Sequence, residues 1–233
     1  MKNWETLEPD VTRLMNRHYT PGRAGQQIRM VVMHHNGGNL TVDDCWQTWQ
    51  TRQATAHYQV QTDGRIGQLV YDRDTAWHAG DWDVNTRSIG IEVANCGGSP
   101  AWPISDKAVV SAARLAAAIC KKYQLGEPAV GENIRFHRDF YPTACPGQLA
   151  PGGVVHKKFM AECKRFFREL SGVATPKHLV TDYQKLTFEQ LVGPGRTPQG
   201  KPDFKGWKQL GGHTVVDALA VIGQTLGIPG FGL

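Results

Sequence analysis

Apolar and polar residues follow one another along this chain in short blocks whose lengths predict strands and helices. Residues Ile28–Met33 (IRMVVM) form a compact apolar run, which is typical of a strand buried on both faces. The polar, glycine-rich turn HHNGG follows at residues 34–38. Residues 1–27 carry several prolines and glycines, and they predict an N-terminal extension made of a short helix and loops.

Three further patterns predict regular elements after that turn. Thr41, with Asp44 three residues later, resembles a capping box and predicts the start of a helix. Residues 57–61 (HYQVQ) and 65–71 (RIGQLVY) flank an Asp-Gly pair, which predicts a β-hairpin with a type I′ turn. Ser88–Val93 (SIGIEV) predicts another short strand.

The second half of the chain is dominated by helical patterns. Ser105 opens a run with apolar residues at helical spacing, and residues 154–170 predict a basic, amphipathic helix. The pattern lapses over a linker at residues 171–178, and residues 179–233 form a small C-terminal region with one clear helix at about 214–226. This order of elements predicts an α/β fold with a mixed central β-sheet flanked by helices, followed by a small C-terminal appendage.

Composition narrows the classes of protein that fit. The net charge of +5 is spread thinly without a Lys/Arg-rich block, which argues against specific nucleic-acid binding but suits the anionic polymers of a bacterial wall. No apolar run reaches about 18 residues, so we expect no membrane insertion. The polar N-terminus predicts no signal peptide, and therefore synthesis in the cytoplasm. Five cysteines at irregular spacing do not predict a disulfide framework.

Candidate metal ligands stand at two places in the chain. His34 and His35 lie where the buried strand stops, and His137 and Cys145 lie together in RFHRDFYPTACPG. Two imidazoles and a thiolate suit tetrahedral zinc, and three protein ligands leave the fourth position to water, as in catalytic sites. Zinc lowers the pKa of such a water to about 7 and polarises a carbonyl. The pattern alone does not choose between His34 and His35, and a lone histidine or cysteine is more often an ordinary surface or core residue.

Five strings, taken in order, resemble the zinc-dependent N-acetylmuramoyl-L-alanine amidases. They are HHNGG, TAHYQVQTDGRIGQ, AWHAGDW, SIGIEV and FHRDFYPTACPG, and together they span roughly residues 28–150. The family includes phage lysins, muropeptide-recycling amidases and peptidoglycan recognition proteins, and this chain is most similar to phage endolysins of Gram-positive hosts. The resemblance implies the amidase/peptidoglycan-recognition fold, with a zinc amidase catalytic domain at residues 28–170.

The resemblance also implies roles for individual residues. It implies three zinc ligands, namely His34, His137 and Cys145. Glu92, in the string SIGIE, matches the general base of many members. Some relatives use a tyrosine at the position of Ala56, so a tyrosine-based mechanism is not implied here. Thr143 stands where the family often has Lys or Thr, and its hydroxyl is expected to hydrogen-bond the oxyanion.

Substrate contacts are implied at a second group of residues. Trp77 and His78, with Trp82 nearby, resemble the family's groove wall, although a tryptophan on a loop can equally cap the edge of a core. Asn36 is a further candidate for substrate binding. The C-terminal region is similar, more weakly, to lysin tails, which implies binding of the cell wall through Phe204 and Trp207; a stabilising subdomain is the alternative.

The function implied is cleavage of the amide between N-acetylmuramic acid and L-alanine by zinc-activated water. A phage or prophage endolysin is expected to act on bacterial peptidoglycan after a holin-type partner releases it from the cytoplasm. The alternatives are a cytosolic muropeptide-recycling amidase and a non-catalytic peptidoglycan-binding protein of the same fold. Non-catalytic members typically lack a metal-site residue, usually the cysteine, and Cys145 is present here.

Overall fold

The computed structural model describes residues 7–172, together with Val221 and Thr225. The chain divides into two compact units, residues 1–173 and 174–233. Phe204 and Trp207, with which the sequence predicts wall binding, lie outside the described residues. So does the predicted helix at about 214–226, except for Val221 and Thr225, which are helical. Within the described part of the chain, no helix has the length and apolar character needed to cross a membrane.

A six-stranded mixed sheet forms the centre of the first unit, with the strand order β1-β5-β4-β7-β3-β8. Its strands are β1 (Val11–Thr12), β3 (Met30–His35), β4 (Tyr58–Val60), β5 (Ile66–Gln68), β7 (Ser88–Val93) and β8 (Ile134–Phe136). β4 and β5 are antiparallel, which confirms the predicted hairpin. The other neighbours pair in parallel. A separate two-stranded sheet joins β2 (Tyr19–Thr20) to β6 (Thr75–Ala76).

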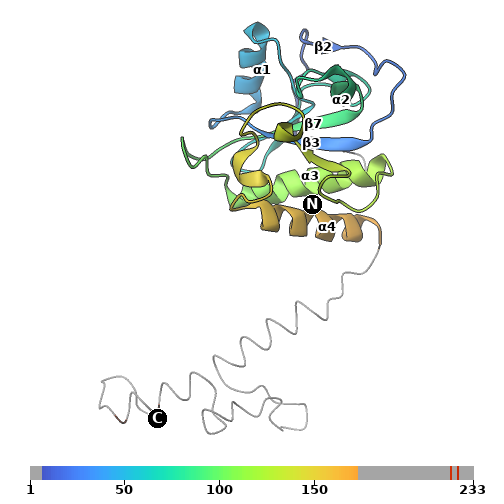
Figure 1. The fold of residues 1–233 in the computed structure, drawn as a ribbon. Helices are drawn as coiled ribbons and strands as arrows, with labels where there is room; N and C mark the ends of the chain where they lie inside the picture. The colour runs from blue at the N-terminus through green and yellow to red at the C-terminus, as the bar shows by residue number, and fades with distance from the viewer. Residues whose placement is uncertain (1–6, 173–220, 222–224, 226–233) are drawn as a thin grey trace. The chain divides into compact units, whose positions relative to one another are not determined.

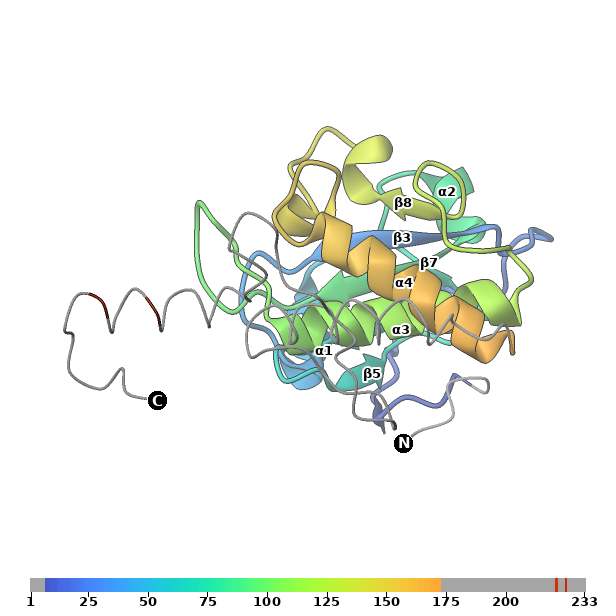
Figure 2. The same ribbon diagram turned by 90° about the horizontal axis from the view of Figure 1, so that it is seen from below.

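Helices cover the sheet on both faces, as the sequence predicted. They are α1 (Val42–Thr51), α2 (Trp82–Thr86), α3 (Asp106–Lys122) and α4 (His156–Leu170), with single 3-10 turns η2 (His137–Asp139) and η3 (Gly147–Leu149). α3 and α4 lie together on one face, whereas α1 and α2 lie on the other side (Figures 1 and 2). Thr41 and Asp44 form the predicted capping box of α1, and the Ser105 side chain caps α3.

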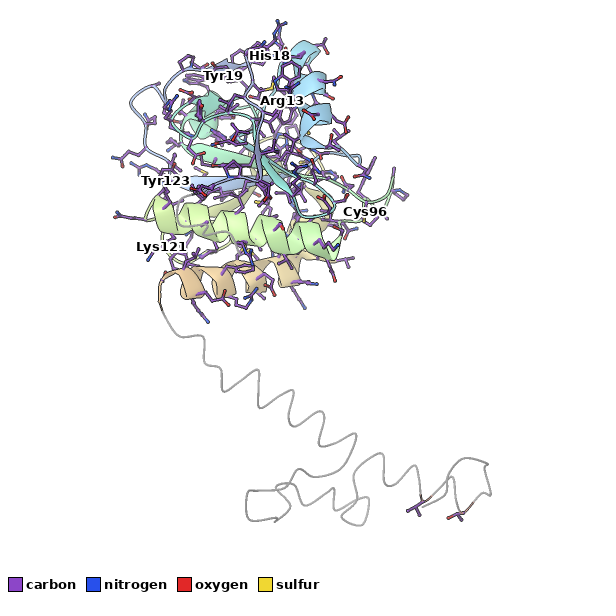
Figure 3. All side chains as sticks on the ribbon, turned by 180° about the vertical axis from the view of Figure 1, so that it is seen from behind. Arg13, His18, Tyr19, Cys96, Lys121 and Tyr123 are labelled. Atoms are coloured by element: carbon purple, nitrogen blue, oxygen red, sulfur yellow. The ribbon has the colours of Figure 1, made fainter. Side chains whose placement is uncertain are left out.

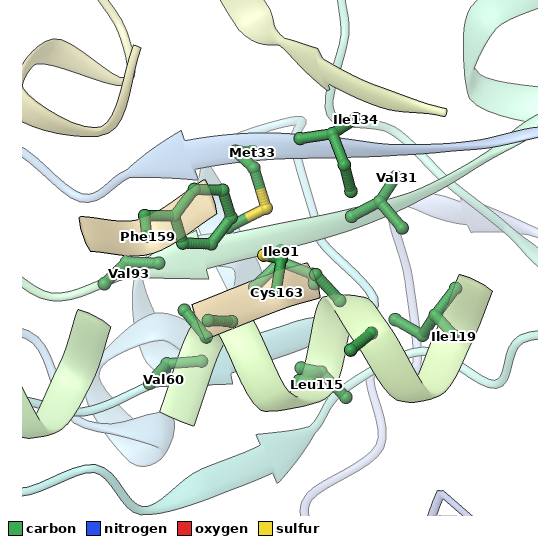
Figure 4. Packing of buried hydrophobic residues seen from close by; sticks show 14 of the residues in the cluster. Val31, Met33, Val60, Ile91, Val93, Leu115, Ile119, Ile134, Phe159 and Cys163 are labelled. Carbon is green, nitrogen blue, oxygen red and sulfur yellow. The ribbon is translucent and has the colours of Figure 1, made fainter. Parts of the chain in front are cut away.

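The two faces of β3 and β7 differ in chemistry because side chains alternate along a strand. Val31, Met33, Ile89, Ile91 and Val93 point to α3 and α4 and form the main core (Figure 4). Val32 packs instead with Ala79 and Val84 on the α2 side. The residues of β3 and β7 that share this second face are Met30, Val32, His34, Ser88, Gly90 and Glu92. The sequence SIGIEV therefore carries one apolar face and one polar face.

Two expectations about the N-terminal half need correction. Residues 7–27 contain no helix; β1 pairs with β5 and forms one edge of the six-stranded sheet, β2 pairs with β6, and part of the segment between them packs beside α1. There the guanidinium of Arg13 stacks over Trp46, and His18 Nδ1 lies 2.7 Å from the Trp49 carbonyl oxygen (Figure 3). β3 also runs on through His34 and His35, because β7 pairs with it as far as Val93.

All five cysteines are free thiols. Cys45, Cys120 and Cys163 are buried, Cys145 is partly buried, and Cys96 is exposed on the loop that follows β7 (Figure 3).

Candidate active site

Polar side chains from three neighbouring strands form a row across the sheet. The register aligns Gln59 of β4 with Glu92 of β7, and Glu92 with His34 of β3. Asn36, just after β3, donates from its amide to Glu92 Oε2 at 3.0 Å and to Gln59 Oε1 at 3.1 Å. Gln59 in turn donates to Asn36 Oδ1 at 2.7 Å. These bonds hold the Glu92 carboxylate in one orientation beside His34.

His34, His137 and Cys145 come together at the end of this row. One ligand atom from each lies within 4.8 Å of the others. β8 leads directly into η2, whose first residue is His137. The backbone N–H of Cys145 donates to Thr143 Oγ1 at 3.2 Å, so the threonine supports the loop that carries the cysteine. The three side chains predicted as ligands are thus neighbours in the structure.

Strand parity separates His34 from its neighbour His35. His34 lies on the same face of β3 as Val32, beside Glu92 of β7, and is almost fully buried, at 1% exposure. His35 points to the opposite face, where its ring packs edge-on to Trp102 at 6.0 Å between centroids. Its backbone N–H, however, donates to Cys145 Sγ at 3.3 Å. The side chain of His34, and not that of His35, therefore faces the cluster.

Burial sets the protonation of these groups. It lowers the pKa of His34 and of His137, so both imidazoles are neutral and can offer a lone pair. Burial raises the pKa of the Cys145 thiol. The thiol must lose its proton to bind a metal, and a metal cation at the site would itself promote that loss. Burial also raises the pKa of Glu92 to about 7, against the opposing charge of Arg52 and the hydrogen bond from Asn36.

A pocket of about 330 Å³ opens beside the cluster, and Trp77, His78, His137 and Tyr141 line it. Tyr141 is 51% exposed and stacks on the His137 ring, with 5.7 Å between centroids. The Trp77 indole N–H donates to Thr20 Oγ1 at 3.0 Å, which fixes the ring in the wall. An open, aromatic-walled pocket next to the candidate metal ligands suits a substrate that carries sugar rings.

The residues predicted to bind substrate fall into different settings. Trp77 and His78 line the pocket, but the His78 ring also lies behind His34, with Nδ1 3.0 Å from His34 Nε2. Asn36 is hydrogen-bonded to Glu92 and Gln59, and Trp82 lies on α2 with 51% of its surface exposed. Tyr141 and Arg52, which also line the pocket, were not predicted. Tyr141 stands in the string FHRDFY, four residues after His137, a spacing that could have identified it.

Comparison with known sequences identifies the family. The family model described as N-acetylmuramoyl-L-alanine amidase matches residues 24–148, which is more than half of the chain. The chain belongs to this family. A curated amidase-family relative, N-acetylmuramoyl-L-alanine amidase A of Achromobacter lyticus, is 34% identical over 104 residues, or 42% of this chain and 55% of the relative. The matched region thus spans about half the length of that relative.

Several solved structures share the fold of this chain. The Staphylococcus aureus hydrolase AmiA superposes with a TM-score of 0.57 at 15% identity, over 71% of this chain and 87% of that one. PlyL superposes with a TM-score of 0.54 at 18% identity, over 66% of this chain and 96% of that one. A mutant endolysin from Bacillus subtilis superposes with a TM-score of 0.52 at 20% identity, over 67% of this chain and 99% of that one. A second family model, the Rv3766 C-terminal domain, matches residues 180–228.

Proposed function

We propose that this chain hydrolyses the amide bond between N-acetylmuramic acid and L-alanine in bacterial peptidoglycan. The observation that carries the proposal is the compact set of His34, His137 and Cys145 beside both the Glu92 carboxylate and an open pocket. Membership of the amidase family supports the choice of substrate and bond.

The donor set fits zinc. Two neutral imidazoles and one thiolate are ligands that zinc prefers, and three protein ligands leave room for substrate or water, as in catalytic zinc sites. When bound by His34, His137 and Cys145, zinc would act as a Lewis acid toward the substrate carbonyl and the attacking water. Because one ligand comes from β3 and the others from the segment after β8, the sheet itself brings them together.

Glu92 is the proton carrier in this proposal. With its pKa raised to about 7, the carboxyl can both accept and release a proton near neutral pH. Glu92 takes a proton from water as the water oxygen bonds to the carbonyl carbon. It then gives that proton to the L-alanine nitrogen as the carbon–nitrogen bond breaks. Asn36 orients the carboxylate, and the Thr143 hydroxyl, which accepts from Cys145 N–H, keeps its own hydrogen to donate to the oxyanion.

We also propose that the enzyme is a lysin that acts on the host wall after release from the cytoplasm. Endolysins such as the one from Bacillus subtilis share its fold, and the additional C-terminal region at 180–228 is not needed for a small soluble muropeptide. Full-length protein should therefore release soluble fragments from purified Gram-positive walls. Activity confined to small muropeptides would favour the recycling role.

Mass spectrometry of reaction products tests the proposed cleavage. Zinc-loaded protein is incubated with a defined N-acetylmuramoyl peptide, with and without a chelator. We expect a free peptide that begins with L-alanine, and its loss on chelation. Intact substrate in the presence of zinc-loaded protein, together with binding to cell walls, would support the non-catalytic alternative instead.

A further inference from the structure

A chain of buried hydrogen bonds runs from helix α2 to the candidate ligand His34. Ser88 Oγ lies 2.6 Å from the Val84 carbonyl oxygen and 3.1 Å from His78 Nε2. The other nitrogen of the same ring, His78 Nδ1, lies 3.0 Å from His34 Nε2. His34 Nδ1 in turn lies 3.9 Å from Cys145 Sγ. All the side chains between Val84 and Cys145 are buried, with Ser88 at 0% and His78 at 8% exposure.

The direction of these hydrogen bonds follows from their fixed end. A carbonyl oxygen can only accept, so the single hydroxyl proton of Ser88 goes to Val84, at the shorter of its two contacts. With the proton elsewhere, two oxygen atoms would face each other at 2.6 Å. Ser88 Oγ must then accept from His78, which places the His78 proton on Nε2.

The remaining assignments follow one from the other. The His78 ring is almost fully withdrawn from water, at 8% exposure, and an imidazole in such surroundings is neutral and carries one proton. Since that proton is on Nε2, Nδ1 has a bare lone pair and accepts from His34 Nε2. His34 is likewise buried and its one proton lies on Nε2, so its Nδ1 is bare and directed toward Cys145. The reverse arrangement would put a proton on the very nitrogen that faces the cluster.

Local structure holds the His78 ring in this place. A Cβ atom at Gly90 would come within 2.6 Å of the ring, so only glycine leaves the ring space against β7. Asn85 Oδ1 accepts from the backbone N–H groups of His78 and Ala79, at 3.1 and 2.8 Å, and so fixes the loop that carries the histidine. The ring is therefore set between β7 and His34 by its surroundings as well as by its own hydrogen bonds.

We propose that His78 and Ser88 are positioning residues that keep the proton of His34 on Nε2 and present Nδ1 to the metal. The inference rests on the proposed function only in taking the cluster to bind zinc. Loss of a residue that hydrogen-bonds a metal ligand commonly weakens metal affinity by roughly 10–100-fold. Substrate binding by His78, expected from the sequence, would then be secondary to its support of His34.

Two-bond nitrogen–hydrogen correlation spectra of the metal-free, full-length protein test the assignment directly. We expect both His34 and His78 as Nε2–H tautomers. His57 is a comparison from the same spectrum. Its Nδ1 accepts from the Gly90 N–H and its Nε2 lies 3.1 Å from the Asp74 carbonyl oxygen, which together indicate Nε2–H, and Arg23 Nη2 lies 2.9 Å from the same Nε2. An Nδ1–H tautomer at His34 would overturn the proposal without reference to any variant or to activity.

Zinc affinity, measured by competition with a chelator, gives the second readout. Ser88→Ala should weaken zinc binding roughly 10–100-fold. The control Thr86→Val removes another buried hydroxyl of the same region, one that donates to Asp83 O, and should leave affinity unchanged. His78→Asn keeps an acceptor near the Nδ1 position and should bind zinc more tightly than His78→Phe. Equal affinities for Ser88→Ala and the unaltered protein would refute the role of Ser88.

These readouts separate the inference from the proposed function. If the tautomers and affinities are as expected but no muramoyl peptide is cleaved, the positioning role stands and the proposed hydrolysis fails. If cleavage occurs while Ser88→Ala binds zinc normally, the hydrolysis stands and the positioning role fails.

Discussion

The two faces of β3 and β7 perform different tasks with the same backbone. One face carries Val31, Met33, Ile89, Ile91 and Val93 against α3 and α4, all fully buried. The other carries His34, Ser88, Gly90 and Glu92, each in contact with another polar group or leaving space for one. Stability comes mainly from the first face, through removal of apolar surface from water. The candidate metal ligand His34 and the candidate proton carrier Glu92 lie on the second face.

The difference shows how a buried polar site is tolerated in a small domain. Unpaired buried polar groups are costly, yet Glu92, Ser88 and His78 all have hydrogen-bond partners. Substitutions on the apolar face should therefore change folding, whereas substitutions on the polar face should change metal binding and catalysis. Single substitutions on each face test that division.

The largest effect is expected at Glu92. Glu92→Gln removes the proton acceptor while retaining a side chain of the same size, so kcat should fall by about 10²–10⁴-fold. Zinc content should stay at one ion per chain. Glu127→Gln is a matched control, because Glu127 is paired with Arg168 on the surface and should leave kcat unchanged. Near-normal turnover of Glu92→Gln would remove Glu92 from the mechanism.

The next largest effect belongs to the apolar face. Phe159 of α4 is fully buried in the core, and Phe159→Ala should lower the free energy of unfolding by about 3–5 kcal/mol. The folded fraction should still bind zinc with unchanged affinity. Val154→Ala, at a site 85% exposed, should change stability by less than about 0.5 kcal/mol. Loss of zinc affinity in folded Phe159→Ala would show that the two faces are coupled.

Glu92 should also make the metal-free protein pH-dependent in stability. Its pKa is about 7 in the folded state, against an ordinary value of 4.5. Between these two pH values the folded state holds a proton on Glu92 that the unfolded state has lost. The resulting contribution to the free energy of unfolding is fully present below pH 4.5 and is lost as the pH rises through 7. Relative to Glu92→Gln, the free energy of unfolding of the unaltered protein should fall by about 2–3 kcal/mol between pH 5 and pH 8. Denaturant unfolding at both pH values checks this, and a constant difference would contradict it.

The smallest effect is expected at the pocket wall. Tyr141 is half exposed and stacks on His137, so Tyr141→Ala should raise KM for a muramoyl peptide by about 2- to 10-fold, which corresponds to the loss of one aromatic contact. Unfolding free energy should hardly change. Tyr71→Ala alters an exposed tyrosine that lines a different pocket and should leave KM unchanged. A fall in kcat alone would place Tyr141 in the chemical step.

Much of the fold could be predicted from local sequence signals. The capping box at Thr41, the hairpin around the Asp-Gly pair and the strand SIGIEV are all encoded within a few residues. The first 27 residues were not predicted well, because β1 and β2 are two residues long and form only by pairing with β5 and β6. Such pairing depends on residues about 55 positions away.

Some residues of the candidate site could also be predicted from the sequence, and others could not. The family resemblance predicted the neighbours His34, His137 and Cys145, whereas the residue pattern alone left His34 and His35 as alternatives. The strand register supplies the physical reason for His34, because it shows which face of β3 each histidine occupies. The contact of His78 with His34 and Ser88 could not be predicted, since it depends on how the loop before α2 folds back onto β7. Arg52 reaches the pocket from the end of α1, which no local pattern indicates.

X-ray absorption of the zinc-loaded protein tests most directly whether the polar face builds a metal centre. We expect one sulfur scatterer at about 2.3 Å and two imidazole nitrogens at about 2.0–2.1 Å, with the sulfur lost in Cys145→Ser. A spectrum without sulfur, or one that Cys145→Ser leaves unchanged, would place the zinc elsewhere and contradict the assignment of the site.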